Sequence, residues 1–170
     1  MNPIETENIN INEKDIVLKD FECILLNKRT IDVETSLIKR VEQSHNFLEL
    51  FIDKKIIYGI NTGLGPMAQY KISEEERYFL QYNLIRSHCS GTGNTINPIM
   101  VKSAMICRLV NFLKGNSGVH PEIVQLLKEF INRDIIPVVY EHGSVGASGD
   151  LVQLSHIALA LIGEGEVFYK

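Results

Sequence analysis

Residues 143–150, Gly143-Ser144-Val145-Gly146-Ala147-Ser148-Gly149-Asp150, form the stretch on which the interpretation of this chain depends. Three of them are glycines and three more are small, so the backbone can adopt conformations and close approaches that bulkier residues forbid. An apolar extended run over 135–140 precedes the stretch, and a helical pattern of apolar residues follows it from Asp150. Two interpretations are open: an anion-binding turn at a helix N-terminus, or a reactive centre made from the chain itself.

The composition of the 170 residues is that of one folded domain, and 45% of them are hydrophobic. The net charge is -4 and the basic residues are scattered, which argues against a nucleic-acid or anionic-membrane partner. No apolar run is long enough to span a bilayer and no signal peptide is visible, so we expect a cytoplasmic protein. Cys23, Cys89 and Cys107 are predicted to be buried thiols, and no metal site is predicted.

The spacing of apolar residues predicts a mainly α-helical chain with short extended segments and a glycine-rich loop. Helices are expected over about 19–27, over 35–50, from the Ser73 capping box to about 89, from Pro98, from Pro121 and over 150–162. Extended segments are expected at 30–33 and 135–140, and a brief strand is expected to open the 54–66 segment before its glycine-rich loop. Residues 1–13 are interpreted as a loose arm, although the alternation of Ile9 and Ile11 also allows an edge strand.

The apolar faces of these helices are broader than the few partners in this chain can cover. Residues 166–170 have the character of a chain that continues. We therefore expect 1–170 to be a single N-terminal domain of a longer protein.

Three separated stretches together resemble the aromatic amino acid ammonia-lyase and aminomutase family, which includes histidine, phenylalanine and tyrosine ammonia-lyases. They are Tyr58-Gly59-Ile60-Asn61-Thr62-Gly63-Leu64-Gly65, Asn83-Leu84-Ile85-Arg86-Ser87-His88 with Gly91-Thr92-Gly93, and residues 143–151. The resemblance implies a helical ammonia-lyase-type N-terminal domain that lacks the long C-terminal helical bundle, in a protein that forms a homotetramer. Within the family, 65–70 and 150–156 are most similar to bacterial tyrosine ammonia-lyases.

The resemblance implies that Ala147, Ser148 and Gly149 cyclise without a helper enzyme into 4-methylidene-imidazol-5-one (MIO), with the assistance of Asp150 and no exogenous cofactor. The amide nitrogen of Gly149 would attack the carbonyl of Ala147, which requires a tight backbone curl and favours a residue without a Cβ. Ser148 is the residue that can lose a hydroxyl to leave a methylidene carbon. Cyclisation gives both Ala147 and Ser148 a specific role, whereas an anion-binding turn would not require either residue.

The resemblance further implies that Tyr58 removes the β-proton of the substrate and that Gly65, Ser87 and His88 bind the substrate. Without the flanking motif, Tyr58 would be interpreted as an aromatic side chain that packs under the loop. A neutral imidazole at His88 can pair with a phenol or an imidazole ring, whereas a phenylalanine ring would leave it unpaired at a cost of about 1–3 kcal/mol.

The expected reaction is therefore the elimination of ammonia from L-tyrosine to give trans-p-coumarate. Val152-Gln153 favours tyrosine, because histidine ammonia-lyases usually have Ala-Pro there. Histidine ammonia-lyase and tyrosine aminomutase stay open as alternatives, and so does a truncated, non-catalytic helical module that binds a partner. Because the remaining catalytic groups belong to the C-terminal region, the isolated chain is expected to be inactive.

Other polar residues have structural interpretations. His45, His120 and His156 lack ligand-spaced partners and are expected at helix surfaces or core edges. A surface role is expected for Arg86, although it could also meet a carboxylate. Residues 141–142 are interpreted either as turn residues or as groups that orient the glycine-rich segment.

Overall fold

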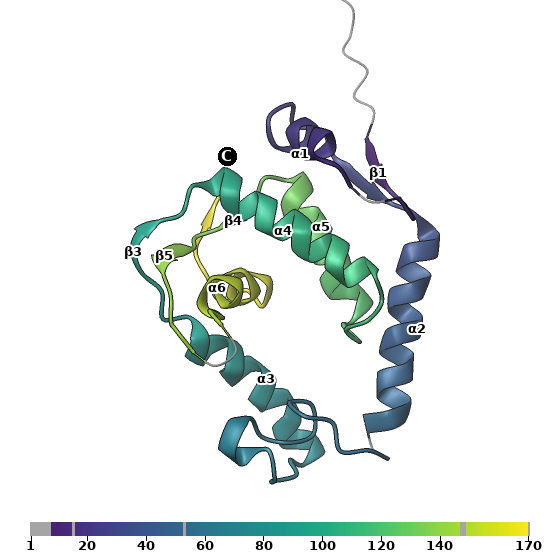
Figure 1. Cartoon of the computed structure of the whole chain (residues 1–170), viewed down its shortest axis with the longest axis vertical. Helices are drawn as coiled ribbons and strands as arrows, with labels where there is room; N and C mark the ends of the chain where they lie inside the picture. Colours follow the sequence, from purple (N-terminus) through teal and green to yellow (C-terminus); the bar gives the residue numbers. More distant parts are fainter. Residues whose placement is uncertain (1–7, 15, 53, 147–148, 170) are drawn as a thin grey trace, which may run out of the picture.

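The structure is a computed structural model that describes residues 8–14, 16–52, 54–146 and 149–169 (Figure 1). The helices are α1 (Leu18–Leu25), α2 (Thr35–Ile52), α3 (Glu74–His88), α4 (Pro98–Leu113), α5 (Pro121–Asn132) and α6 (Val152–Leu161). The strands are β1 (Ile9–Ile11), β2 (Ile31–Val33), β3 (Thr92–Thr95), β4 (Ile136–Pro137), β5 (Tyr140–His142) and β6 (Val167–Phe168), and a short 3-10 helix covers Gly65–Met67. The mainly α-helical prediction is confirmed.

Helices α4 and α5 form the centre of the core. Their inward side chains recur at three- and four-residue intervals, as in Met105, Ile106 and Leu109 of α4, all of which are fully buried. Both helices begin where the sequence predicts, because Asn97 and His120 accept backbone N–H bonds just before a proline in the first turn. In Figure 1, α2 lies beside this pair on one side and α6 lies on the other, between the pair and α3.

The strands pair in three short sheets within the described residues. β1 pairs in parallel with β2, β3 pairs antiparallel with β5, and β4 pairs antiparallel with β6. Ile9–Ile11 thus form the edge strand that their alternation allowed rather than part of a loose arm, and Ile11 is buried. β3 was not predicted, because its Thr92-Gly93-Asn94-Thr95 sequence is polar and exposed and has no apolar alternation.

The brief strand expected at the start of 54–66 is wrong, because this segment forms turns. The buried side chain of Asn61 explains the difference. Its Nδ2 donates to the carbonyls of Ile52 (2.5 Å) and Lys55 (2.7 Å), and its Oδ1 accepts from the N–H of Ile57 (2.7 Å). These bonds use the backbone groups that a strand partner would need, so the segment curls around one amide.

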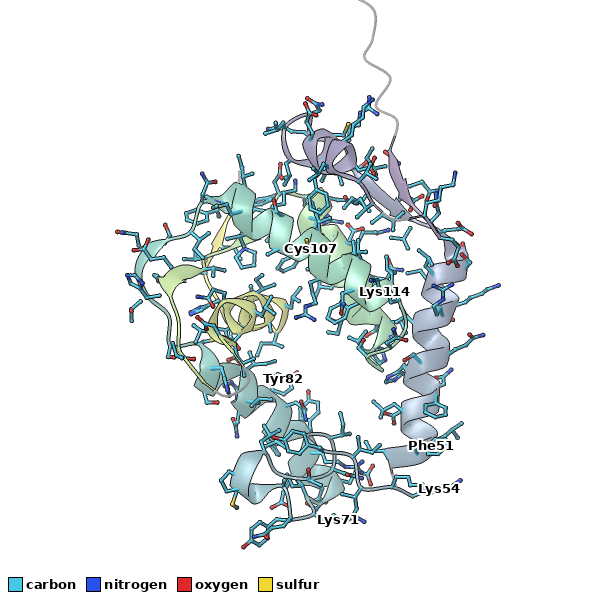
Figure 2. The ribbon with its side chains drawn as sticks, in the orientation of Figure 1. Phe51, Lys54, Lys71, Tyr82, Cys107 and Lys114 are labelled. Carbon is cyan, nitrogen blue, oxygen red and sulfur yellow. The ribbon has the colours of Figure 1, made fainter. Side chains whose placement is uncertain are left out.

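Two smaller predictions also need correction. α6 begins at Val152 rather than at Asp150, whose side chain instead accepts a hydrogen bond from the first turn. Cys107 is an exposed residue of α4 (Figure 2), and Cys23 and Cys89 are only partly buried, so the prediction of three buried thiols is wrong. Among the described residues, no helix combines the length and apolar character needed to cross a membrane.

Candidate active site

The turn that leads from β5 into α6 is closed by its own backbone and by one carboxylate. The N–H of Gly149 donates to the carbonyl of Gly146 (3.1 Å), and Gly149 has a φ of 85°, a conformation that favours glycine. Asp150 Oδ1 accepts the N–H groups of Ser144 (3.2 Å) and Val152 (3.0 Å). Asp150 therefore ties the start of the turn to the first residue of α6. Ala147 and Ser148, the other two residues predicted to cyclise, lie outside the described residues.

The carboxylate of Asp150 is exposed but held in its charged form. The N–H groups of Val152 and Ser144 keep the pKa of this carboxyl below its ordinary value, because both bonds favour the ionised oxygen. Gly143 makes room for this arrangement, since a Cβ at that position would overlap the Asp150 carboxylate. The assisting position predicted for Asp150 thus has a defined geometry: the carboxylate lies within the turn and holds it closed.

Ser87 and His88 lie in the last turn of α3, where the sequence places them. Ser87 Oγ donates to the carbonyl of Leu84 (3.0 Å), and His88 Nδ1 lies 2.8 Å from the same oxygen. Because a carbonyl oxygen can only accept, His88 Nδ1 carries a proton there. The Nε2 atom of the neutral ring is then an acceptor.

His88 lines an apolar hollow of about 350 Å³ that α3, α4, α5 and α6 surround. Leu84 and Leu151 lie in the same lining, so the hollow connects the end of α3 with the residue that follows Asp150. The structure therefore brings the predicted substrate-binding histidine close to the start of α6. It offers this histidine a largely apolar space into which an aromatic ring fits.

Tyr58 and Gly65 contact each other within the loop between α2 and α3. The N–H of Gly65 donates to Tyr58 Oη (3.0 Å), and Tyr58 is 63% exposed. It does not pack under the loop. The side chain of Gln81, in the middle of α3, holds this loop by donating to the carbonyl of Gly59 (2.9 Å).

The predicted site residues form two groups rather than one. Figure 1 shows the loop that contains Tyr58 and Gly65 at the N-terminal end of α3, whereas the path from β5 into α6 lies at the C-terminal end. The side chain of Gln81, which bonds this loop, precedes His88 by seven residues, or about 10 Å at 1.5 Å per residue. Ser87, His88, Gly149 and Asp150 therefore lie at the C-terminal end of this helix, and the Tyr58 loop packs on its N-terminal half as far as its middle.

The sequence did not reveal two connections near the site. Arg86, expected to have a plain surface role, forms a two-point ion pair with Glu164 beyond α6, with its Nε 2.8 Å from Glu164 Oε2. Its guanidinium also lies 5.3 Å from the centre of the Tyr82 ring. His156 Nε2 accepts the N–H of Gly91 (3.2 Å). In the sequence, only the Arg86-Ser87-His88 run and the glycine at 91 mark these positions. Neither indicates that Arg86 pairs with a residue 78 positions away or that Gly91 bonds one 65 positions away.

No cluster of three or more potential metal ligands occurs in the ranges that the structure describes. Residues 141–142 belong to β5, and Glu141 accepts a bond from Asn94 Nδ2 of β3 (3.0 Å). These two residues thus take part in strand pairing.

Residues 16–170 match the family model described as aromatic amino acid lyase. The histidine ammonia-lyases of Macrococcus caseolyticus and Staphylococcus saprophyticus are 40% and 41% identical to this chain over 164 and 163 residues, covering 96% and 95% of it. The tyrosine aminomutase from Streptomyces globisporus superposes with a TM-score of 0.86 at 30% identity, covering 96% of this chain and 31% of that one.

The chain therefore belongs to the aromatic amino acid lyase family. It spans about a third of the length of the curated relatives it matches, 33% of both the Macrococcus and the Staphylococcus enzyme.

Proposed function

We propose that the full-length protein containing this chain eliminates ammonia from L-tyrosine and releases trans-p-coumarate. The observation that carries the proposal is the orientation of His88, whose Nδ1 is engaged by the Leu84 carbonyl. Its Nε2 is an acceptor for the hydroxyl of a phenol ring. A phenylalanine ring offers no donor and would leave this nitrogen unpaired, at a cost of about 1–3 kcal/mol.

Leu84, Leu151 and Leu154 line the hollow around His88 and suit the carbon body of a phenol. Arg108 and Ser155 line it too, so a polar partner is also within the lining for the second nitrogen of an imidazole. The preference for tyrosine over histidine therefore rests on Val152-Gln153, where histidine ammonia-lyases usually have Ala-Pro. Histidine is the second candidate substrate, because the curated relatives described above are histidine ammonia-lyases. A tyrosine aminomutase is a third candidate, since such an enzyme shares the fold.

The described part of the 143–152 segment fits the MIO group proposed for it. The positive φ of Gly149 and its bond to Gly146 support this proposal, because cyclisation between Ala147 and Gly149 requires a tight backbone curl. When formed, this group supplies an electrophile for the substrate amine. Asp150 holds the two ends of the segment together through Ser144 and Val152. The first turn of α6 presents free N–H groups and the positive end of its dipole to this segment, which favours negative charge there.

Tyr58 is proposed as the base that takes the β-proton, and in that role its oxygen must first carry negative charge. The Gly65 N–H donated to Oη supports this role, because a donor at that oxygen stabilises the charge. We further propose that each active site gathers residues from several subunits of a homotetramer.

The test uses the full reading frame that contains this chain, with L-tyrosine, L-histidine and L-phenylalanine as substrates. We expect kcat/KM to be highest for tyrosine. The His88→Leu variant, which removes the acceptor, should narrow the preference for tyrosine over phenylalanine by about tenfold or more. His88→Gln, which keeps an acceptor, is the matched control. Faster turnover of histidine than of tyrosine by the unmodified enzyme would overturn the tyrosine assignment.

A further inference from the structure

His156 connects the two segments that carry the site, although it belongs to neither. It lies on α6, which begins two residues after Asp150, and its Nε2 accepts the N–H of Gly91 at 3.2 Å. Gly91 follows His88 by three residues. The imidazole ring also packs edge-on against Tyr140 of β5, with 5.4 Å between ring centres. A single side chain thus joins the segment after His88 to the helix after Asp150.

The contact depends on the identity of both partners. A Cβ on Gly91 would lie only 2.8 Å from His156 Nε2, so the backbone approaches the ring this closely only because the residue is glycine. The bond also requires that Nε2 carry no proton, since the Gly91 N–H is the donor. The partial burial of the ring lowers the pKa of His156 and thereby favours this neutral form.

We propose that His156 is a positioning residue for the elimination reaction: through Gly91 it fixes Ser87 and His88 relative to the 143–150 segment. The proposal rests on the proposed function for its catalytic meaning, but the link itself is a property of the fold. Arg86 and Glu164 join α3 to the end of α6 by an exposed ion pair. His156 makes a second, partly buried connection, which joins α6 to Gly91 in the segment after α3.

The groups around His156 define how the link responds to acid. Glu164 and Glu166 line the same hollow of about 300 Å³ as His156 and Tyr140, and Glu164 is neutralised by Arg86. When Nε2 becomes protonated, the ring and the Gly91 N–H are both donors and the bond is lost. The positioning of His88 should therefore be lost as the pH falls through the pKa of His156.

The experiment compares His156→Phe with His156→Gln in the full-length enzyme. Phenylalanine keeps an aromatic ring beside Tyr140 but has no acceptor, whereas glutamine keeps an acceptor without a ring. We expect kcat/KM of His156→Phe to fall roughly 10- to 100-fold, mainly through a higher KM, because a misplaced binding group costs about this much. His156→Gln should recover to within about threefold, and it should lose the acid-side decline that titration of His156 gives the unmodified enzyme.

Hydrogen–deuterium exchange of the 89–93 peptide measures the link without any turnover. Exchange should be faster in His156→Phe than in the unmodified protein and should return to normal in His156→Gln. Equal activity losses in both variants, or unchanged exchange in His156→Phe, would overturn the proposal. An unmodified enzyme that turns over no aromatic amino acid would count against the proposed function instead, and the exchange result would still decide the link.

Discussion

The loop over 57–65 and the turn over 143–152 are both glycine-rich, but the fold stabilises them in opposite ways. The first is organised around Asn61 and Thr62, which are each 2% exposed and bind backbone groups on several sides. The second is organised around the exposed carboxylate of Asp150 and a glycine in a left-handed conformation. One loop is held by neutral buried side chains, and the other by a charged side chain in contact with water.

The difference follows from what each segment is proposed to do. Buried amide and hydroxyl groups tolerate no unpaired atom, so they define a single loop conformation that presents Tyr58 at the surface. An exposed carboxylate contributes little to the stability of the whole fold, so its displacement should change the turn and its chemistry rather than unfold the chain. The two loops should therefore respond differently to substitution and to pH.

Gly143→Ala should produce the largest effect in the molecule. The added methyl group would displace the Asp150 carboxylate from the N–H groups of Ser144 and Val152. We expect loss of the cyclised group and a fall in activity on the order of 100-fold or more, because a small displacement of reacting groups already costs that much. Mass spectrometry of the peptide around 143–153 measures the cyclisation directly, as a mass deficit of two waters.

Gly146→Ala is the matched control for this substitution. Among the described residues, a Cβ at Gly146 meets no atom closer than 3.7 Å, which is an ordinary contact. This variant should cyclise and turn over substrate nearly as well as the unmodified protein. If both variants keep the two-water deficit, Asp150 does not need its position in the turn for cyclisation.

Asn61→Ala should have the next largest effect, and it acts on the other loop. The substitution leaves the Ile52 and Lys55 carbonyls and the Ile57 N–H without their partner. We expect a loss of about 2–4 kcal/mol in the free energy of unfolding, since each buried unpaired group costs about 1–3 kcal/mol. The shift of the urea midpoint at constant slope measures this loss.

Asn94→Ala provides the control for Asn61. Asn94 is exposed and donates one bond to Glu141, so its removal should change the free energy of unfolding by about 0.5 kcal/mol or less. Similar losses of unfolding free energy in Asn61→Ala and Asn94→Ala would contradict the conclusion that buried hydrogen bonds hold the 57–65 loop.

The elements that depend on local chemistry could be predicted from the sequence. The capping box of Ser73 and Glu76 starts α3, and Asn97 and His120 cap α4 and α5, because each cap uses atoms within three residues. For the same reason, the sequence placed Ser87 and His88 at the end of α3.

The elements that depend on distant partners could not be predicted. β3 exists only because it pairs with β5, and the partner of Gly91 is a histidine 65 residues away. Helix α3 also exposes large aromatic side chains, since Tyr78 and Phe79 are both 64% exposed in this chain. The candidate site residues could therefore be named from the sequence, whereas the contact between the Tyr58 loop and the middle of α3 required the structure.

Lowering the pH should reduce the amide protection of the 143–152 turn but not that of the 57–65 loop, and we expect this to be the smallest of the predicted effects. The pKa of Asp150 lies below its ordinary value of 3.8, so the ionised carboxylate stabilises the folded turn above that pH. The contribution disappears as the pH falls through the lowered pKa, when Asp150 takes up a proton. Amide exchange in 143–153, corrected for the intrinsic rate, should then lose its protection, whereas Asn61 and Thr62 do not titrate and should keep the 57–65 loop protected. Asp150→Asn, which cannot ionise, should abolish the pH dependence of exchange in 143–153. Simultaneous loss of protection in both loops would instead indicate global acid unfolding. Glu76 and Glu164 also contribute to such unfolding, because their pKa values are lowered in the folded chain.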